Sequence, residues 1–549
     1  MNIKPAFVFA ALVCPLFPAA QTAGTIRGVV TDAASGQPLP YVTVIVSNTA
    51  TGAATADDGT FIINNVPVGR HTVQAGFIGY ETAIVKEIPV GSVREVYLEI
   101  KLTEKPMELG EVVVRPKINK AAALNEMATL GARVFSVEEA SRYAGGMDDP
   151  ARLASGFAGV TTEAANNNGI SIHGNSPGLL QWRIEGVEIS NVNHFADITQ
   201  AGGGFLSALS SNVVGNSDFF TGAFPAEYGN AVAGVFDMRL RNGNSQKYQH
   251  AFQFGIQGID FASEGPVSKK NNASYIVNYR YSTIGLLEKM SDMEESMNFQ
   301  DLNFRLNFPT RRAGTFSLWG VGLIDNISTL VDEPAEWKYR DDGIASAAKL
   351  ASGATGLSHK YLFGNNKTSL HTTLAATLQN TSIDEDIYDL NKNGSPMSDM
   401  TSSIANFVLT SSLNHKFSAR HTNKTGFTLT NIRYDMKFDY APLFGDPLES
   451  YIDADGSATL VSAYSSSKIN IGNSLTLTAG VNAQFLSLSK KAAVEPRVGL
   501  RWQASPINSF AIAYGLHSRM EKADAYFVED ANGNQPNRKL GFTKSHHLM

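Results

Sequence analysis

The sequence predicts a mostly-β protein that is exported and whose longer part forms an antiparallel membrane barrel. Three observations predict this class. Residues 1–20 have the pattern of an export signal, no later segment is a long apolar helix, and residues 242–549 alternate between apolar and polar side chains. An exported chain with amphipathic strands and no helical spans has one way to cross a membrane, which is the closed barrel.

The composition agrees with a surface that partly faces lipid. Charged residues make up 17% of the chain, below the roughly 25% of soluble globular proteins. The net charge of −6 is mild and gives no reason to expect a nucleic-acid partner. The only cysteine, Cys14, lies within the predicted signal peptide of residues 1–20. The mature chain therefore has no disulfide and no thiolate metal site.

Residues 21–103 predict a small β-sandwich of short strands. Turn signals at residues 36–40, 57–59 and 66–69 separate apolar segments such as Tyr41–Val46. The series resembles the regulatory-like, transthyretin-type domain of carboxypeptidases. No histidine begins an H-x-x-E or H-E-x-x-H zinc motif, so we expect the regulatory module without its enzyme.

A glycine-punctuated block begins with Ile172-His-Gly174 and Ile184–Ile189 and ends with Gly222–Gly229 and Gly234–Arg239. It resembles the plug domain of TonB-dependent outer-membrane receptors. The resemblance assigns residues 117–241 to a mixed α/β plug, a folded globule that fills a lumen too wide for barrel side chains to fill.

Between these domains, residues 104–116 predict a linker. It contains an extended valine-rich segment that can add as a strand to a partner sheet. By resemblance this segment is the TonB box, with Leu109, Glu111, Val112, Val113 and Val114 as its residues. The alternative is one more edge strand of the first domain.

Residues 242–549 show the alternation most clearly. Leu302, Phe304, Leu306 and Phe308 share one face, and Asn303, Arg305 and Asn307 share the other. Tight connections recur at residues 266–272, 309–314, 364–367, 418–423, 467–473 and 504–508. Longer polar connections lie at 325–353, 381–401, 437–456 and 521–540. Short turns on one side and long loops on the other are typical of outer-membrane barrels.

We expect about thirteen strands in this part, whereas the barrel of the family has about twenty-two. The chain is therefore expected to be the N-terminal part of a longer receptor, with an incomplete barrel.

Two segments mix aromatic and polar residues in or beside plug loops and are candidate ligand contacts. They are Gln181, Trp182 and Arg183, and Asn193, His194 and Phe195. A buried Trp182 or a packed His194 is the competing interpretation. Plugs of the family usually have Arg-Gly where this chain has His173-Gly174, and the plug arginine pairs with barrel glutamates. The candidates for a plug–barrel contact are His173, Glu495 and Arg497, although a histidine can form a charge-assisted bond only when protonated.

Two further motifs are weak. Asp389, Asn391 and Asn393 copy the first half of a calcium loop, but Met400 stands where the bidentate glutamate belongs. A solvated outer loop is the favoured explanation of these residues, with weak calcium binding as the alternative. Gly174–Gly178 matches the G-x-S-x-G nucleophile motif, but Pro177 has no N–H for an oxyanion hole. We therefore reject catalysis.

The resemblance implies a bacterial outer-membrane transporter of the TonB-dependent class, with plug and first domain on the periplasmic side, no enzymatic activity and no cofactor. It would take up an external nutrient such as a metal chelate, vitamin, peptide or glycan. Its partners would be a periplasmic TonB-type energy-coupling protein, outer-membrane lipid and a candidate surface lipoprotein. The alternatives are a surface receptor or adhesion barrel that binds without transport, and a soluble secreted binding module.

Overall fold

The computed structural model describes residues 23–92, 94–104, 123–135, 149–162, 167–198, 201–255, 258–284, 295–331, 333–505, 508–530 and 532–549. The predicted signal peptide and the predicted TonB-box residues, Leu109 to Val114, lie outside these ranges. The chain divides into two compact units, residues 1–118 and 119–549. Among the described residues, no helix is long and apolar enough to span a bilayer.

The first unit is the predicted sandwich of two small sheets. Strand order is β4-β1-β7 in one sheet and β3-β2-β5-β6 in the other. Val44 and Val46 are buried while Ile45 between them is 43% exposed, as expected where one face of each strand packs on the opposite sheet. The strands are β1 (Ala23–Asp32), β2 (Thr43–Val46), β3 (Gly52–Ala54), β4 (Thr60–Pro67), β5 (Gly69–Gly76), β6 (Ala83–Val90) and β7 (Val96–Leu102).

The second unit contains a globule of short elements, the predicted plug. Its main sheet has the order β12-β11-β16-β15-β8, in which β11 and β16 run parallel. A short helix, α2 (Pro150–Ala154), is capped by the Asp149 carboxylate. The strands are β8 (Ala132–Phe135), β9 (Val160–Thr162), β10 (Ile170–Ile172), β11 (Leu180–Ile184), β12 (Val187–Ile189), β13 (Asn193–His194), β14 (Leu206–Ser207), β15 (Ser217–Phe220) and β16 (Gly234–Met238).

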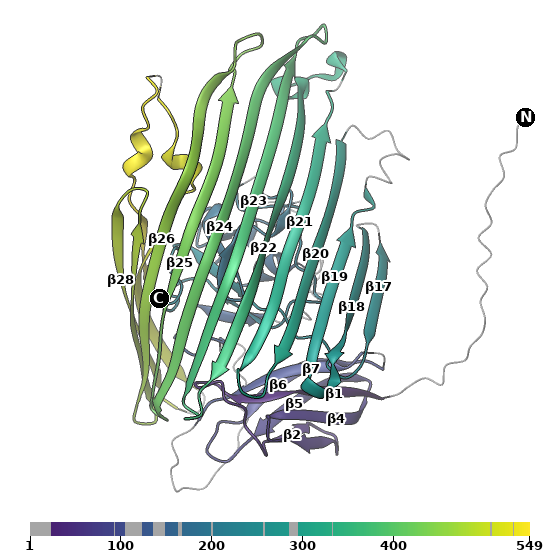
Figure 1. Ribbon diagram of the computed structural model, residues 1–549, viewed down its shortest axis with the longest axis vertical. Helices are drawn as coiled ribbons and strands as arrows, with labels where there is room; N and C mark the ends of the chain where they lie inside the picture. Colours follow the sequence, from purple (N-terminus) through teal and green to yellow (C-terminus); the bar gives the residue numbers. More distant parts are fainter. Residues whose placement is uncertain are drawn as a thin grey trace, which may run out of the picture. The chain divides into compact units, whose positions relative to one another are not determined.

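Around the plug stands one antiparallel sheet of fourteen strands, which follow each other in sequence order (Figure 1). We call this sheet the wall. Its strands are β17 (Gln249–Gly255), β18 (Gly258–Ser268), β19 (Ala273–Tyr281), β20 (Glu295–Pro309), β21 (Thr315–Thr329), β22 (Ile344–Leu362), β23 (Thr368–Tyr388), β24 (Gly394–Ser418), β25 (His421–Tyr440), β26 (Glu449–Ile471), β27 (Leu475–Leu486), β28 (Lys491–Gln503), β29 (Ser509–Arg519) and β30 (Thr543–Leu548).

Burial along the wall strands is the reverse of burial in a soluble protein. In β20, Asn303 and Asn307 are 0% and 8% exposed, whereas Leu302 and Phe308 are 41% and 37% exposed. The polar row packs on the plug and the apolar row faces outward. A soluble sandwich would bury its apolar row, so this arrangement is the one expected of a membrane barrel.

The tight connections predicted from the sequence join strands as expected, and the wall has fourteen strands where about thirteen were predicted. The longer connection at 521–540 is a loop between β29 and β30 as predicted, but others differ from the prediction. The polar segment 381–401 is mostly strand, because β23 continues to Tyr388 and β24 begins at Gly394. The segment 437–456 likewise contains the ends of β25 and β26. Main-chain pairing continues through these polar residues, so the expected loops are tall hairpins.

Candidate functional site

A cavity of about 670 Å³ lies between the plug and the inner face of the wall. Its floor consists of plug segments 177–191, 196–198 and 227–230 with Gly202, and its sides come from strands β23 to β27 and the segment 519–528. Cavities of this size are typical of sites for small molecules. We therefore take this cavity, with the contacts that hold its floor, as the candidate site.

The cavity lies towards the end of the wall that carries the long hairpins. Met400, Phe438 and Ile452 line it, and they stand close to the hairpin connections at residues 389–393 and 441–448. The first described segment of the plug lies at the other end, where Arg501 donates a hydrogen bond to the Thr129 carbonyl. Arg501 precedes the tight connection at residues 504–508. The cavity and the start of the plug are therefore at opposite ends of the wall.

Of the first predicted ligand segment, Trp182 is a support for the floor. Trp182 is 4% exposed, and its ring stacks on that of Phe236 in the parallel neighbour strand, with centroids 4.9 Å apart. Gln181 and Arg183 also line the cavity. The Gln181 amide donates to the Glu188 carboxylate at 3.0 Å and to the Gly229 carbonyl at 3.0 Å.

Arg183 is held inside the floor. It donates to the Gly186 carbonyl at 2.6 Å, and its guanidinium lies 5.2 Å from the centre of the Tyr228 ring. The turn that follows places Glu185 at φ 51° and Gly186 at φ 82°, as a tight hairpin requires. Burial would raise the pKa of Glu185, but Arg305 of the wall, 2.7 Å away, holds that pKa below its usual value.

The second predicted ligand segment is buried against the wall. Asn193 and His194 are 0% exposed and Phe195 is 5% exposed. His194 Nδ1 lies 2.6 Å from an Asp325 oxygen, and Nε2 lies 3.0 Å from an Asp301 oxygen. None of these three residues lines the cavity.

We call His194, Asp301, Asp325 and Arg280 the histidine anchor. Both ring nitrogens of His194 face carboxylate oxygens, which only accept hydrogen bonds, so both nitrogens carry protons. Burial would lower the pKa of His194, but the bonds to Asp301 and Asp325 outweigh burial and raise it. Arg280 donates to Asp301 at 2.9 Å and balances the second carboxylate.

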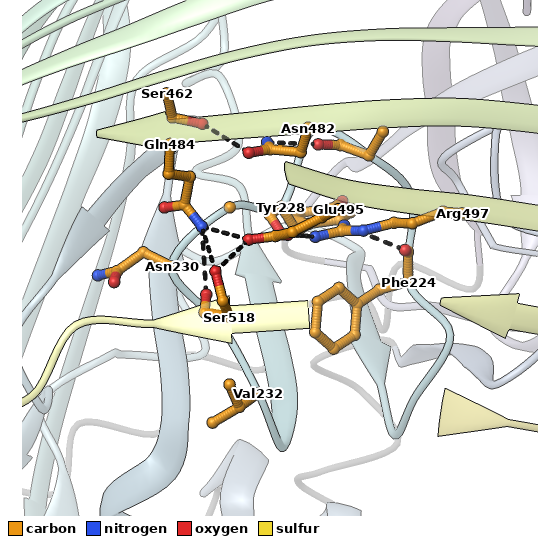
Figure 2. Close-up of polar contacts among 12 residues, drawn as sticks. Phe224, Tyr228, Asn230, Val232, Ser462, Asn482, Gln484, Glu495, Arg497 and Ser518 are labelled. Carbon is orange, nitrogen blue, oxygen red and sulfur yellow. Dashed lines mark hydrogen bonds and ion pairs between the residues drawn. The ribbon is translucent and has the colours of Figure 1, made fainter. Parts of the chain in front are cut away.

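On the opposite flank, Arg497 holds the plug by its main chain (Figure 2). The guanidinium donates to the carbonyls of Phe224 at 3.2 Å and Tyr228 at 2.9 Å, and also to the Pro225 carbonyl. It pairs with Glu495, which is 0% exposed. Glu495 accepts further hydrogen bonds from Gln484 and Ser518, each at 2.5 Å. We call Arg497, Glu495, Gln484 and Ser518 the arginine anchor.

Of the three predicted plug–barrel residues, Arg497 contacts the plug, and Glu495 supports it from within the wall by pairing with Arg497. His173 lies apart from them in an exposed turn at φ 51°, where its N–H donates to the Gly159 carbonyl at 2.8 Å. The sequence offered a signal for the contacts that we missed. Asp301, Arg305 and Asp325 are charged residues in the inward row of strands whose outward row is apolar.

The two weak motifs have local structural roles. Asp389 accepts hydrogen bonds from the Asn391 and Asn393 N–H groups at 2.9 and 2.8 Å, so its carboxylate closes its own turn. Among the described residues, no group of three or more metal-binding side chains is present. The Ser176 hydroxyl accepts from the Gly178 N–H at 3.4 Å and caps the short 3-10 helix η1 (Pro177–Leu179).

The N-terminal domain and the larger unit match different known proteins. Residues 26–114 match the family model of the CarboxypepD_reg-like domain, as the sequence predicted. That match extends through the predicted TonB-box residues, Leu109 to Val114. No curated protein sequence matches the chain.

The fold matches solved TonB-dependent siderophore and heme receptors. The siderophore receptor PiuA from Acinetobacter baumannii has a TM-score of 0.55 and 12% identity, over 79% of this chain and 71% of that one. A second match is a double mutant of the Serratia marcescens hemophore receptor HasR, in complex with its hemophore HasA and heme. It has a TM-score of 0.53 and 10% identity, over 76% of this chain and 68% of that one.

A mutant of the ferric enterobactin receptor PfeA from Pseudomonas aeruginosa has a TM-score of 0.51 and 13% identity, over 72% of this chain. The chain spans 63% of the length of that receptor. At these identities the likeness establishes the fold of wall and plug.

Proposed function

We propose that this chain belongs to a TonB-dependent receptor that takes up an external ligand across the bacterial outer membrane. The observation that carries the proposal is the polarity of the larger unit. The cavity lies at the end with long hairpins, and the start of the plug lies at the end with tight turns. In outer-membrane barrels, long loops are extracellular and tight turns are periplasmic.

The polarity gives each part of the site a role. A ligand enters from outside, and the plug floor, fixed by the histidine and arginine anchors, blocks its passage. The segment that precedes the plug is then on the periplasmic side, where an energy-coupling protein of the TonB type can pair with it as an added strand. Passage requires that force on this segment loosen the plug. No bond in the ligand is made or broken.

The test uses the valine segment. Val113→Pro removes one main-chain donor and stiffens the strand, so we expect uptake to fall to background while ligand binding at the cell surface is unchanged. The matched control, Val113→Ile, keeps the donor and the extended preference and should keep uptake. Uptake and surface binding are measured with labelled ligand in cells with and without the energy-coupling protein.

Normal uptake by Val113→Pro would contradict the assignment of residues 109–114 as the TonB box. Surface binding that is never followed by energy-dependent uptake would replace the transporter with a surface receptor or adhesion barrel.

A further inference from the structure

The wall changes the polarity of its outer face along the tall hairpins of β23 to β26 (Figure 1). In the part of these strands nearer the tight turns, the outward side chains are apolar and exposed, as lipid requires. Nearer the hairpin connections the outward row is charged, with exposed Asp384, Lys437 and Asp453. Charges on the outer face of a barrel are unfavourable in lipid, so we place this part of the wall in water beyond the membrane. The exposed apolar residues of the outward row are Leu374, Phe407, Leu429 and Val461.

The inner face of the same hairpins is apolar. Because side chains alternate along a strand, the inward row consists of the residues next to those charges. Met400 of β24 pairs with Ile383 of β23 on one side and with Phe438 of β25 on the other. Phe438 pairs in turn with Ile452 of β26. These four residues lie side by side at one level and all line the cavity. We call them the apolar row.

Another part of this inner face is covered by the protein itself. The connection between β29 and β30 places Tyr526 and Phe527 against it, and both side chains are buried. Phe527 packs on Tyr434 of β25, with ring centroids 4.7 Å apart. An apolar inner face that stands beyond the membrane is thus stabilised where a second apolar group shields it from water.

The apolar row lies beside that covered area and stays accessible. Ile383, Met400 and Phe438 are each partly exposed although they face the interior of the wall. Val528, which also lines the cavity, is 37% exposed. Accessible apolar surface that gathers inside a cavity is typical of a ligand site, and the volume of this cavity suits a small molecule.

The plug floor of the same cavity is polar. Ser190, Asn191 and Asn230 line it and are partly exposed. Asn230 donates to the Glu188 carboxylate at 3.1 Å, and Asn191 donates to the Gly203 carbonyl at 2.9 Å. A ligand in the cavity therefore meets apolar side chains on the wall and hydrogen-bonding groups on the floor.

We propose that the apolar row binds the apolar group, a ring or an alkyl chain, of an amphipathic ligand whose polar part lies on the plug floor. This inference rests on the proposed uptake function and adds the chemistry of the ligand. The physical basis is that the ligand group and the apolar row both leave water when they come into contact.

Two substitutions in the apolar row replace apolar side chains by polar ones of similar size. Ile383→Thr keeps the β-branch that suits a strand, and Met400→Gln keeps the length of the side chain. Met400→Leu is the conservative variant, because it keeps the apolar character. The matched control is Leu390→Gln, which changes an exposed apolar residue in the connection of the same hairpin, outside the cavity lining. Heat-modifiable migration on gels checks that each variant is folded.

Binding is measured by calorimetry on the purified full-length receptor in lipid nanodiscs, with empty nanodiscs as the blank. The probes are uncharged β-glucosides that carry a 2-naphthyl, a hexyl or a methyl group. Acetamides with the same groups on nitrogen repeat the series with another polar part.

We expect the naphthyl or the hexyl probe of at least one series to bind about tenfold more tightly than its methyl counterpart, equivalent to about 1.4 kcal/mol. The tighter of the two distinguishes a ring from a chain. The double variant Ile383→Thr/Met400→Gln should weaken that binding about tenfold, whereas Met400→Leu and Leu390→Gln should leave it within about twofold.

Equal affinity for the probes within both series would overturn the apolar site, and so would unchanged binding of the apolar probes by the folded double variant. The nanodiscs contain no energy-coupling protein, so this result is independent of uptake. Uptake in cells that depends on Val113 would then leave the transporter in place and remove only the apolar site. Tight binding of an apolar probe together with normal uptake by Val113→Pro would keep the apolar site and remove the TonB-box assignment.

Discussion

The plug is anchored to the wall on two flanks, and the two anchors use different chemistry. On the flank of β19 to β21, the plug side chain of His194 meets the wall carboxylates Asp301 and Asp325. Arg280 pairs with Asp301 and also donates to the Ser207 carbonyl of the plug at 2.7 Å. On the flank of β27 to β29, Arg497 meets neutral main-chain carbonyls and a single carboxylate.

The second difference is the position of each anchor relative to the cavity. Gln484 of the arginine anchor lines the cavity, whereas none of the histidine-anchor residues does. The arginine anchor therefore borders the cavity, whereas the histidine anchor does not. Both anchors are buried and charged, so this comparison teaches that burial and charge alone do not place an anchor at the cavity.

The largest expected effect comes from the arginine anchor. Arg497→Met leaves Glu495 buried without its counter-charge and removes the donors to three plug carbonyls. We expect the free energy that holds plug residues 222–232 against the wall to fall by about 3–5 kcal/mol. Hydrogen exchange of residues 222–232 in the purified protein measures the loss.

Arg433→Met is the control, because Arg433 lies in the outward row of β25, where it packs over the Phe407 ring. Exchange at residues 222–232 that is as slow in Arg497→Met as in the control would show that this anchor does not hold the plug.

A smaller effect is expected from pH on the histidine anchor. The pKa of His194 in the folded protein is raised above 6.5. The stabilisation of the folded state by protonated His194 is therefore complete below pH 6.5, and it is lost as pH rises through the folded-state pKa. The loss amounts to about 1.4 kcal/mol per pH unit between the two pKa values. We expect hydrogen exchange at residues 190–198, corrected for the intrinsic rate, to accelerate above pH 6.5.

His194→Gln should abolish this pH dependence, and His359→Gln, at the tight-turn end of the wall, should preserve it. Exchange that accelerates with pH equally in His194→Gln would mean that another group carries the dependence.

The sequence predicted the wall and the sandwich because alternation is a local property. Leu302 to Phe308 show the inward and outward rows without reference to any other strand. The tall hairpins were missed because polar alternation, as in residues 381–388, looks the same in a loop and in a strand paired beyond the membrane. Residues 381–388 form a strand because they pair with β24, and strand pairing depends on residues elsewhere in the sequence.

The site was predictable only in part for the same reason. Gln181, Arg183, Glu495 and Arg497 could be selected from their motifs. The partners of His194 lie 107 and 131 residues away along the chain, and the carbonyl of Phe224 lies 273 residues from Arg497. The inward rows mark Asp301 and Asp325 as charges inside the wall, but a single sequence does not show that they meet His194. For His194 the sequence therefore left both a ligand contact and a packed position open, and the structure shows it packed in an anchor.

The orientation of the wall tests the account most directly. Two single variants are compared. Asn393→Cys lies in a long-hairpin connection and Asn365→Cys in a tight connection. Intact cells that carry each variant are treated with a membrane-impermeant maleimide. We predict that Asn393→Cys is labelled in intact cells and that Asn365→Cys is labelled only after the outer membrane is permeabilised. Labelling of Asn365→Cys alone in intact cells, or equal labelling of both, would contradict a cavity that opens to the outside and the uptake that depends on it.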